Sequence, residues 1–209
     1  FDLIFLVPGA SAQTERQREY HLEPDGDQIG LHVGGRYRLT DRLTTDFGLR
    51  WDKNTLTDGN DDHFSPRLAL LYGITPRTQL RASWGRFYQS QAINELQVED
   101  GVTEFLPAQR ADHWVLGLSQ LFGDELELRL EGYYKDYDRL RARYENFLNY
   151  RVLLPELYPD RIRIDPDSTE AYGVEASLAR RGPGPVNWWV NYTWSSVEDQ
   201  TAEGDVPRS

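Results

Sequence analysis

Hydrophobic and polar residues alternate with a period of two along most of this chain. The clearest case is the stretch 125–137, where one face is apolar and ends in a tyrosine while the other face is charged. Its apolar positions include Leu126, Leu128, Leu130 and Tyr134, and its charged positions include Glu127, Arg129, Glu131 and Lys135. A strand points successive side chains to opposite faces, whereas a helix would spread these charges around its circumference. The stretch is therefore predicted to be a strand with one apolar and one aqueous side.

The same pattern predicts further strands, joined by connections that alternate between short and long. The expected strands are 1–7, 28–39, 42–54, 64–74, 78–89, 110–122, 125–137, 167–180 and 185–197. Tight turns are expected at 40–41, 75–77, 123–124 and 182–184, and long loops at 8–27, 58–63, 90–109, 138–166 and 198–209. Tight turns join antiparallel neighbours, so the pattern predicts an up-and-down sheet with one short rim and one elaborate rim. Residues 1–7 have a second interpretation, as the tail of a secretory signal, because Ala10-Ser11-Ala12 is typical of a cleavage site.

Charge separates the two faces of these strands. The apolar face carries a single formal charge in this assignment, Arg86. The residues expected to face the lumen of a barrel are Arg36, Arg38, Asp46, Arg50, Arg81, Glu127, Arg129, Glu131 and Glu175, and Asp52, Arg67 and Lys135 share their face. Alternation alone does not say which face points inward, because a soluble barrel alternates equally well.

The positions of the aromatic residues indicate that the apolar face points toward membrane lipid. They gather near the two ends of the apolar stripe, and Leu, Ile and Val fill its middle, as on a lipid-facing barrel surface where rings settle at the headgroup level. The aromatics expected at the lipid interface are Trp51, Trp114, Tyr134, Tyr172, Trp188 and Trp194. The predicted fold is therefore all-β: an antiparallel up-and-down transmembrane β-barrel, present as an incomplete arc of about eight or nine strands. A soluble β-barrel binding protein is an alternative.

Composition narrows the function classes. The net charge of −11 argues against nucleic-acid binding, which needs Lys and Arg to neutralise phosphates. The chain has no Cys, which excludes disulfides and thiolate metal sites, and no Met, which favours a fragment of a longer protein. The longest apolar run, residues 3–7, is far shorter than the roughly 20 residues of a spanning helix.

No arrangement of residues predicts catalysis, a cofactor or a metal site. Glu127 and Glu131 share a face, but an ion network around Arg129 explains them more simply than acid–base chemistry. The four His residues lack metal-ligand spacing, and the aspartates near residue 60 lack the order of a calcium loop.

The loop 138–166 combines arginines with tyrosines. Guanidinium groups and aromatic rings can capture an anionic ligand, so ligand binding is hypothesised for Arg139, Arg141, Arg143, Tyr144 and Tyr150. The same residues could instead bind lipopolysaccharide phosphates or one another.

Several segments of the sequence resemble the barrel of TonB-dependent outer-membrane receptors. They are Gly48-Leu49-Arg50-Trp51-Asp52, Ser65-Pro66-Arg67-Leu68-Ala69-Leu70, Leu80-Arg81-Ala82-Ser83-Trp84-Gly85-Arg86-Phe87-Tyr88 and Ala171-Tyr172-Gly173-Val174-Glu175. The resemblance covers residues 28–197 and implies a 22-stranded barrel of Gram-negative bacteria, closed by an N-terminal plug and energised through TonB. No plug, TonB box or terminal aromatic strand is visible in the sequence, so it is expected to be a piece of the barrel wall.

The resulting hypothesis is a wall segment of a receptor in the bacterial outer membrane that imports a scarce nutrient: a siderophore, cobalamin, haem or glycan. Its expected partners are outer-membrane lipid, lipopolysaccharide, the plug, TonB and an unidentified small molecule. A small porin or adhesin, in which the arc closes on itself, is the main alternative. An outer-membrane enzyme is a third interpretation, which lacks a recognisable nucleophile and base.

Overall fold

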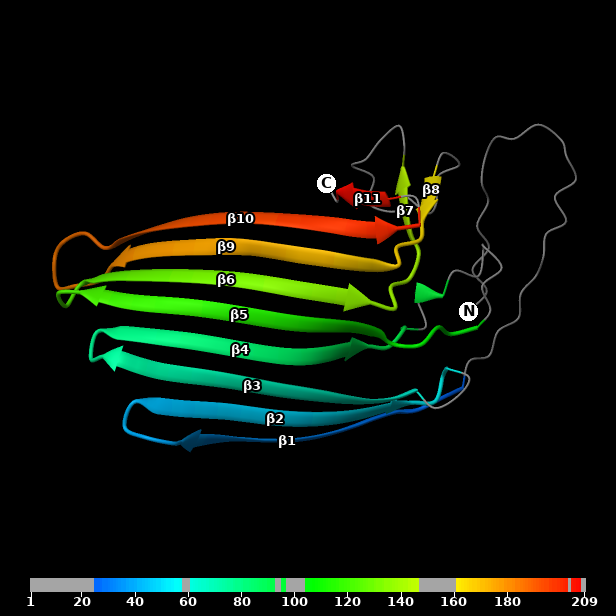
Figure 1. The fold of residues 1–209 in the computed structure, drawn as a ribbon, viewed down its shortest axis with the longest axis horizontal. Coiled ribbons are helices and arrows are strands. Elements are labelled where there is room, and N and C mark those ends of the chain that lie inside the picture. Colours follow the sequence, from blue (N-terminus) through cyan, green and yellow to red (C-terminus); the bar gives the residue numbers. More distant parts are fainter. Residues whose placement is uncertain are drawn as a thin grey trace, which may run out of the picture.

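The chain forms one antiparallel sheet of nine strands, with a separate two-stranded hairpin at one end (Figure 1). The computed structural model describes residues 25–57, 61–92, 95–96, 104–146, 161–202 and 204–207. The sheet contains β1 (Gln28–Arg38), β2 (Leu43–Asn54), β3 (Asp61–Thr75), β4 (Thr78–Gln89), β5 (Gln109–Phe122), β6 (Leu126–Asp138), β9 (Ser168–Arg180), β10 (Trp188–Thr201) and β11 (Gly204–Pro207). The hairpin pairs β7 (Arg143–Asn146) with β8 (Arg161–Ile164).

Sheet order follows sequence order, apart from the hairpin inserted between β6 and β9. The turn between β1 and β2 is fixed by Thr40, whose Oγ1 accepts the backbone N–H groups of Arg42 and Leu43 at 3.2 and 3.0 Å. Gly123, between β5 and β6, has φ 60°, a backbone conformation that favours glycine. This up-and-down arrangement, which is not closed into a barrel here, confirms the predicted fold class.

The sheet has no apolar core. The buried hydrophobic side chains of the described residues are three alanines, Ala108, Ala171 and Ala179. Large apolar side chains stay exposed along the face predicted to be apolar; Leu31, Leu116 and Val190, for example, are 64%, 57% and 61% exposed. The sheet is not closed, and side chains on its other face are exposed as well, for example Trp189 at 72%. None of the helical segments described is long and apolar enough to span a membrane.

Three elements differ from the sequence-based assignment. The segment 138–166, predicted to be a loop, contains the β7–β8 hairpin, and the segment 198–209 contains the end of β10 and all of β11. Strand β3 begins at Asp61 rather than at residue 64. The strand predicted at 1–7 lies outside the described residues.

Pro66 coincides with a divergence of strands. From Arg67 to Thr75, β3 pairs with β4, whereas from Asp61 to Pro66 it pairs only with β2. Proline has no N–H to donate to a neighbouring strand, which explains why the β3–β4 ladder stops there. Ala108, just before β5, lies beside this part of β3: its backbone N–H is 3.3 Å from Asp61 Oδ1.

Candidate functional site

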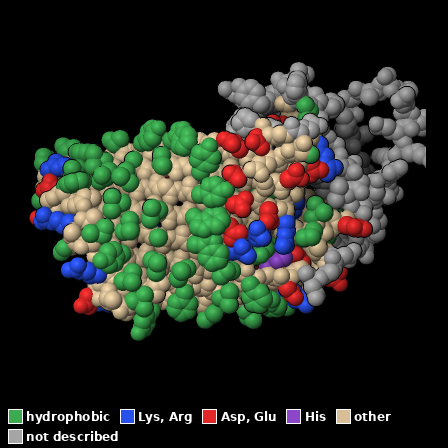
Figure 2. All heavy atoms as spheres, in the orientation of Figure 1, with side chains coloured by type: hydrophobic (Ala, Val, Ile, Leu, Met, Phe, Trp, Pro, Cys, Tyr) green, Lys and Arg blue, Asp and Glu red, His purple; other side chains and the backbone are tan. Residues whose placement is uncertain are grey.

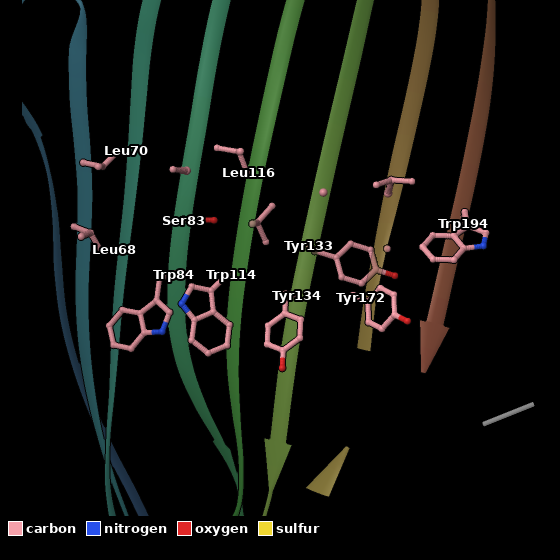
Figure 3. Close-up of a pocket in the computed structure, with 15 residues that line it drawn as sticks. Leu68, Leu70, Ser83, Trp84, Trp114, Leu116, Tyr133, Tyr134, Tyr172 and Trp194 are labelled. Carbon is pink, nitrogen blue, oxygen red and sulfur yellow. The ribbon is translucent and has the colours of Figure 1, made fainter. Parts of the chain in front are cut away.

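The apolar face ends in a row of aromatic side chains toward the long-loop end of the sheet. Trp84, Trp114, Tyr134 and Tyr172 lie opposite one another in register across β4, β5, β6 and β9 (Figure 3). The ring centroids of Trp114 and Tyr134 are 5.6 Å apart, and Tyr172 contacts Trp194 at 5.9 Å. The sequence predicts that aromatic rings gather near this end of the apolar face, and contact of this row with a lipid headgroup layer stays a prediction.

A row of charges lies directly above the aromatic row on the same face. Each of five strands contributes the residue two positions beyond its member of that row, which on β10 is Ser196, opposite Tyr172. These residues are Arg86, Asp112, Asp136, Glu170 and Glu198, and they lie opposite one another in register. Figure 2 shows the charged cluster beside the hydrophobic surface. The sequence-based count of one charge on the apolar face is therefore wrong. Asp112, Asp136 and Glu170 lie inside the predicted strands 110–122, 125–137 and 167–180, in register with Arg86, and belong to the same face.

The charged row is partly neutralised by two arginines. Arg86 donates from Nε and Nη2 to Asp112 at 2.9 and 3.1 Å, and Arg110 lies 3.4 Å from Asp112 and 2.5 Å from Asp138, its own register partner. Burial, together with the carboxylates of Asp138 and Glu170, raises the pKa of Asp136, which lies outside the span bounded by the aromatic row.

The remaining predicted interface aromatics lie elsewhere on the same face. Trp51 is opposite Leu31 and Phe64 in register, and Trp188 is opposite Arg180 near the short-turn end. Their contact with lipid stays a prediction.

The opposite face carries the charges predicted to line a lumen, and several of them pair along or across the strands. Arg36 forms a two-pronged ion pair with Asp46 at 2.6 and 2.9 Å, and Arg50 reaches Asp52 at 2.6 Å. Arg129 donates to Glu127 at 2.8 Å. Arg38, Arg81, Glu131 and Glu175 lie in one register row across β1 to β9, with the two glutamates directly opposite each other. The structure thus places the predicted lumen residues on a single face.

A cluster of cations and rings occupies this face toward the long-loop end. The guanidinium of Arg67 lies 4.6 Å above the ring of Phe87, which packs at 4.7 Å against His113, and His113 meets Tyr137 at 5.8 Å. Lys135 lies over the ring of Tyr133, 4.9 Å from its centroid. We call Arg67, Phe87, His113, Lys135 and Tyr137 the upper lumen cluster.

The upper lumen cluster has open space beside it. Gly48 and Gly85 flank Arg67 in register, and their lack of side chains leaves a hollow of about 360 Å³ that Phe87 and His113 also line. Nε2 of His113 is buried and has no hydrogen-bond partner among the described residues. The sequence marks His113 only as a scattered polar position and gives Phe87 no role. Both residues lie on the charged face of adjacent strands, and that shared face is the signal that could have joined them.

The residues hypothesised to bind ligand divide into separate environments. Arg141 donates to Glu95 Oε2 at 2.6 Å and to the Gln89 carbonyl at 3.2 Å. Arg139 is half exposed and lies 3.9 Å from Asp138. Tyr144 lies on β7, and Tyr150 falls outside the described residues.

Arg143 is held by two carboxylates. It donates to Asp199 Oδ2 from Nε at 2.9 Å and from Nη2 at 2.6 Å, and it also donates to Glu145. Although burial opposes its charge, the hydrogen bonds to Glu145 and Asp199 raise the pKa of Arg143. Arg141 and Arg143 are therefore engaged with carboxylates of this chain, which is one of the alternatives left open by the sequence.

Glu127 and His63, two of the residues weighed for catalysis or metal binding, both have partners in the structure. Glu127 is committed to Arg129, and no group of three or more His, Asp or Glu side chains in the described part could hold a metal ion. His63 instead stacks on Tyr88 at 4.3 Å and bonds the buried Asp61 at 2.5 Å.

Comparisons with known proteins agree with this architecture. The sequence matches the family model described as TonB dependent receptor-like, beta-barrel, over residues 7–209. The curated proteins include no match to the sequence. Among solved structures, it is similar to the alcaligin outer-membrane receptor FauA of Bordetella pertussis, with 20% identity and a TM-score of 0.56 over 88% of this chain and 32% of that one.

Two other solved structures are similar in the same way. The ferripyoverdine receptor of Pseudomonas aeruginosa, solved with ferripyoverdine, has 17% identity and a TM-score of 0.61 over 88% of this chain and 24% of that one. The iron transporter FrpB of Neisseria meningitidis has 16% identity and a TM-score of 0.60 over 87% and 27%. The chain thus spans between about a quarter and a third of the length of these proteins.

Proposed function

The chain belongs to the TonB-dependent receptor β-barrel family, and from that premise we propose that it forms part of the wall of an outer-membrane receptor that binds and imports a scarce nutrient. The aromatic row would lie at the outer membrane surface, and the long-loop end would face the exterior. The charged lumen face would meet an N-terminal plug of the parent protein, with TonB supplying energy from the inner membrane.

The upper lumen cluster is the observation that best supports a ligand. It brings two cations, Arg67 and Lys135, together with the rings of Phe87 and Tyr137 on the lumen side of the long-loop end. Cations attract an anionic chelate and rings stack on its aromatic groups. We therefore favour a ferric chelate with aromatic donors over cobalamin, haem or a glycan. Arg139 and Tyr144, nearer the loops, would make the first contact with it.

Uptake of radioactive iron from ferric tris(2,3-dihydroxybenzoate) by cells expressing the parent protein tests this proposal. Arg67→Ala should weaken uptake affinity roughly tenfold or more, the scale of losing one charged interaction. Arg129→Ala is a matched control, because Arg129 shares the lumen face but pairs with Glu127, and neither residue lines the hollow beside the cluster. Equal affinity of wild type and Arg67→Ala, at equal outer-membrane amounts, would contradict the assigned site. Absence of any uptake by wild type would contradict the ligand class.

A further inference from the structure

The β7–β8 hairpin is structurally separate from the wall that carries it. Its strands pair only with each other, four residues on each side, and they add no ladder to the nine-stranded sheet. An isolated two-stranded hairpin is marginal in water. Something other than strand pairing must therefore set where this hairpin lies.

Asp199, near the end of β10, supplies a fixed point. It is fully buried, and it lies on the lumen face because it has the parity of Asn191 and Thr193 rather than of Trp194. Thr169 on β9, its register partner, is also buried and donates its hydroxyl to Asp199 Oδ1 at 2.5 Å. This bond leaves Oδ2 directed to the fork of Arg143, which donates to it twice.

The contact between Arg143 and Asp199 is suited to fixing orientation. A guanidinium is planar and presents its donors in a rigid fork, so two bonds to one carboxylate restrict both distance and direction. The carboxylate is inaccessible to water, which means that the arginine cannot be exchanged for solvent without leaving a buried charge. Arg141, by contrast, donates to Glu95 in the loop before β5 and to the carbonyl of Gln89 at the end of β4, so it does not duplicate the contact with the wall at β10.

We propose that Asp199 is a positioning residue, which, through Arg143 and with Thr169 behind it, holds the β7–β8 hairpin against the lumen face at the mouth of the barrel. This inference rests on the proposed function, since a fixed hairpin would hold Tyr144 and Arg163, which lie opposite each other in its register, at the mouth of the lumen. Arg143 thereby changes role: it secures the hairpin and does not bind the ligand.

The position of the hairpin can be measured directly in the parent protein. This chain has no cysteine, so spin labels can be placed at Ile162→Cys on β8 and Asp62→Cys on β3, both of which are exposed, once any cysteines elsewhere are replaced. The distance distribution between the labels should be narrow in the wild type. It should broaden in Asp199→Asn and in Arg143→Gln.

Two comparisons separate positioning from general destabilisation. Glu125→Gln breaks an ion pair with Arg180, 2.8 Å long, at the opposite end of the wall, and it should leave the distribution narrow. The double variant Asp199→Asn/Arg143→Gln should be no broader than either single variant, because both act through one contact. An unchanged distribution in Asp199→Asn, or additive broadening in the double variant, would overturn the proposal.

Ligand affinity provides a separate readout. The dissociation constant for ferric tris(2,3-dihydroxybenzoate) should rise roughly tenfold in Asp199→Asn, a typical coupling between a binding surface and a remote residue, with the outer-membrane amount unchanged. Unaltered affinity despite a broadened hairpin would overturn the link to ligand binding. If the wild type does not bind this chelate, the ligand class of the proposed function fails, while the label distances still decide whether Asp199 positions the hairpin.

Discussion

Gly132 and Gly173 lie close together in the wall but have different surroundings. Gly132 on β6 is on the apolar face, and a Cβ built there would meet only a carbonyl oxygen at 3.9 Å. Gly173 on β9 is on the lumen face, where a Cβ would approach the Trp194 carbonyl oxygen to 2.5 Å and the hydroxyl of Tyr133 to 2.7 Å. Tyr133 lies directly across from Gly173 in register, so the glycine makes room for that ring.

Gly173→Ala should therefore destabilise the barrel, because the Trp194 carbonyl is backbone and cannot rotate away. We expect a loss of about 1–3 kcal/mol, the usual cost of overpacking, in urea unfolding of the refolded parent protein in detergent micelles. Gly132→Ala is the matched control and should leave the midpoint unchanged or slightly higher. Equal midpoints for the two variants would contradict the close contact at Gly173.

Asp136 lies between like charges. Burial and the carboxylates of Asp138 and Glu170 raise its pKa, so ionising it in the folded state is unfavourable. That penalty is absent below the unfolded pKa of about 3.9 and grows as the pH rises through the higher folded value. Asp136→Asn should thus stabilise the parent barrel at pH 7 by about 0.5 kcal/mol, the scale of one cross-strand pair.

Unfolding midpoints at pH 7 and pH 3.5 check this sign. The gain of Asp136→Asn over wild type should be present at pH 7 and vanish at pH 3.5. Asp124→Asn serves as the control, because its carboxylate is on an exposed turn and pairs with Arg77 at 3.1 Å. A gain that persists at pH 3.5 would show that the asparagine stabilises for another reason.

At this scale the sequence predicted the face of a residue better than its partners. Parity alone put Arg50 and Glu131 on one face and Leu49 on the other, as the register of the structure has them, because side chains alternate strictly along a strand. It could not predict that Asp199 is buried, since its partner Arg143 is 56 residues away and lies on an inserted hairpin. The upper lumen cluster was not predicted for a similar reason: its members come from four strands, and the sequence does not specify the register between those strands.

Strand β3 offers a direct test of which face meets lipid. Leu70 and Leu71 are adjacent and have the same side chain, and they are similarly exposed, at 38% and 41%. Leu70 shares its face with Trp84 and Leu116, whereas Leu71 is opposite Arg81 on the lumen face. The surroundings therefore differ in polarity while size and exposure are matched.

Leu70→Arg should cost about 2 kcal/mol of barrel stability, within the range for a lipid-facing arginine away from the interface. Leu71→Arg should cost much less, because the lumen is wet and its neighbour Arg81 can move away. Urea unfolding of each variant in lipid vesicles measures the difference. A larger loss for Leu71→Arg would reverse the assignment of the two faces.

The elements were predictable where the alternation was long and one face was strongly apolar. Eight strands of the sheet have eleven or more residues with such a face, which is more than enough to separate a period of two from noise. Strands β7, β8 and β11 have four residues each. In β7 the letters Arg-Tyr-Glu-Asn give no apolar side, so no pattern was present to find.

At the scale of the whole molecule, the sheet has two edges without a partner. The β1 edge is unpaired along its length in the described structure, and β10 pairs with β11 only from Glu198 to Thr201. An exposed strand edge tends to pair with another strand, and a barrel has no exposed edge because its sheet is closed. Family membership favours further strands of the parent protein at both edges, whereas the small porin or adhesin alternative requires β1 to pair with β10.

Thiol crosslinking separates these two closures, since the chain has no cysteine. Val33→Cys on β1 can be combined in turn with Val190→Cys, Tyr192→Cys or Trp194→Cys on β10, which covers three registers on one face. Leu130→Cys with Ala176→Cys is the positive control, because these residues are opposite in the β6–β9 ladder, where Cβ atoms lie about 5 Å apart. With a short thiol-reactive crosslinker, we expect the control pair to react and all three edge pairs to remain separate in the parent protein. If any edge pair reacts as efficiently as the control, β1 pairs with β10 and the eight long strands close on themselves. The arc would then be a complete small barrel rather than part of a receptor wall.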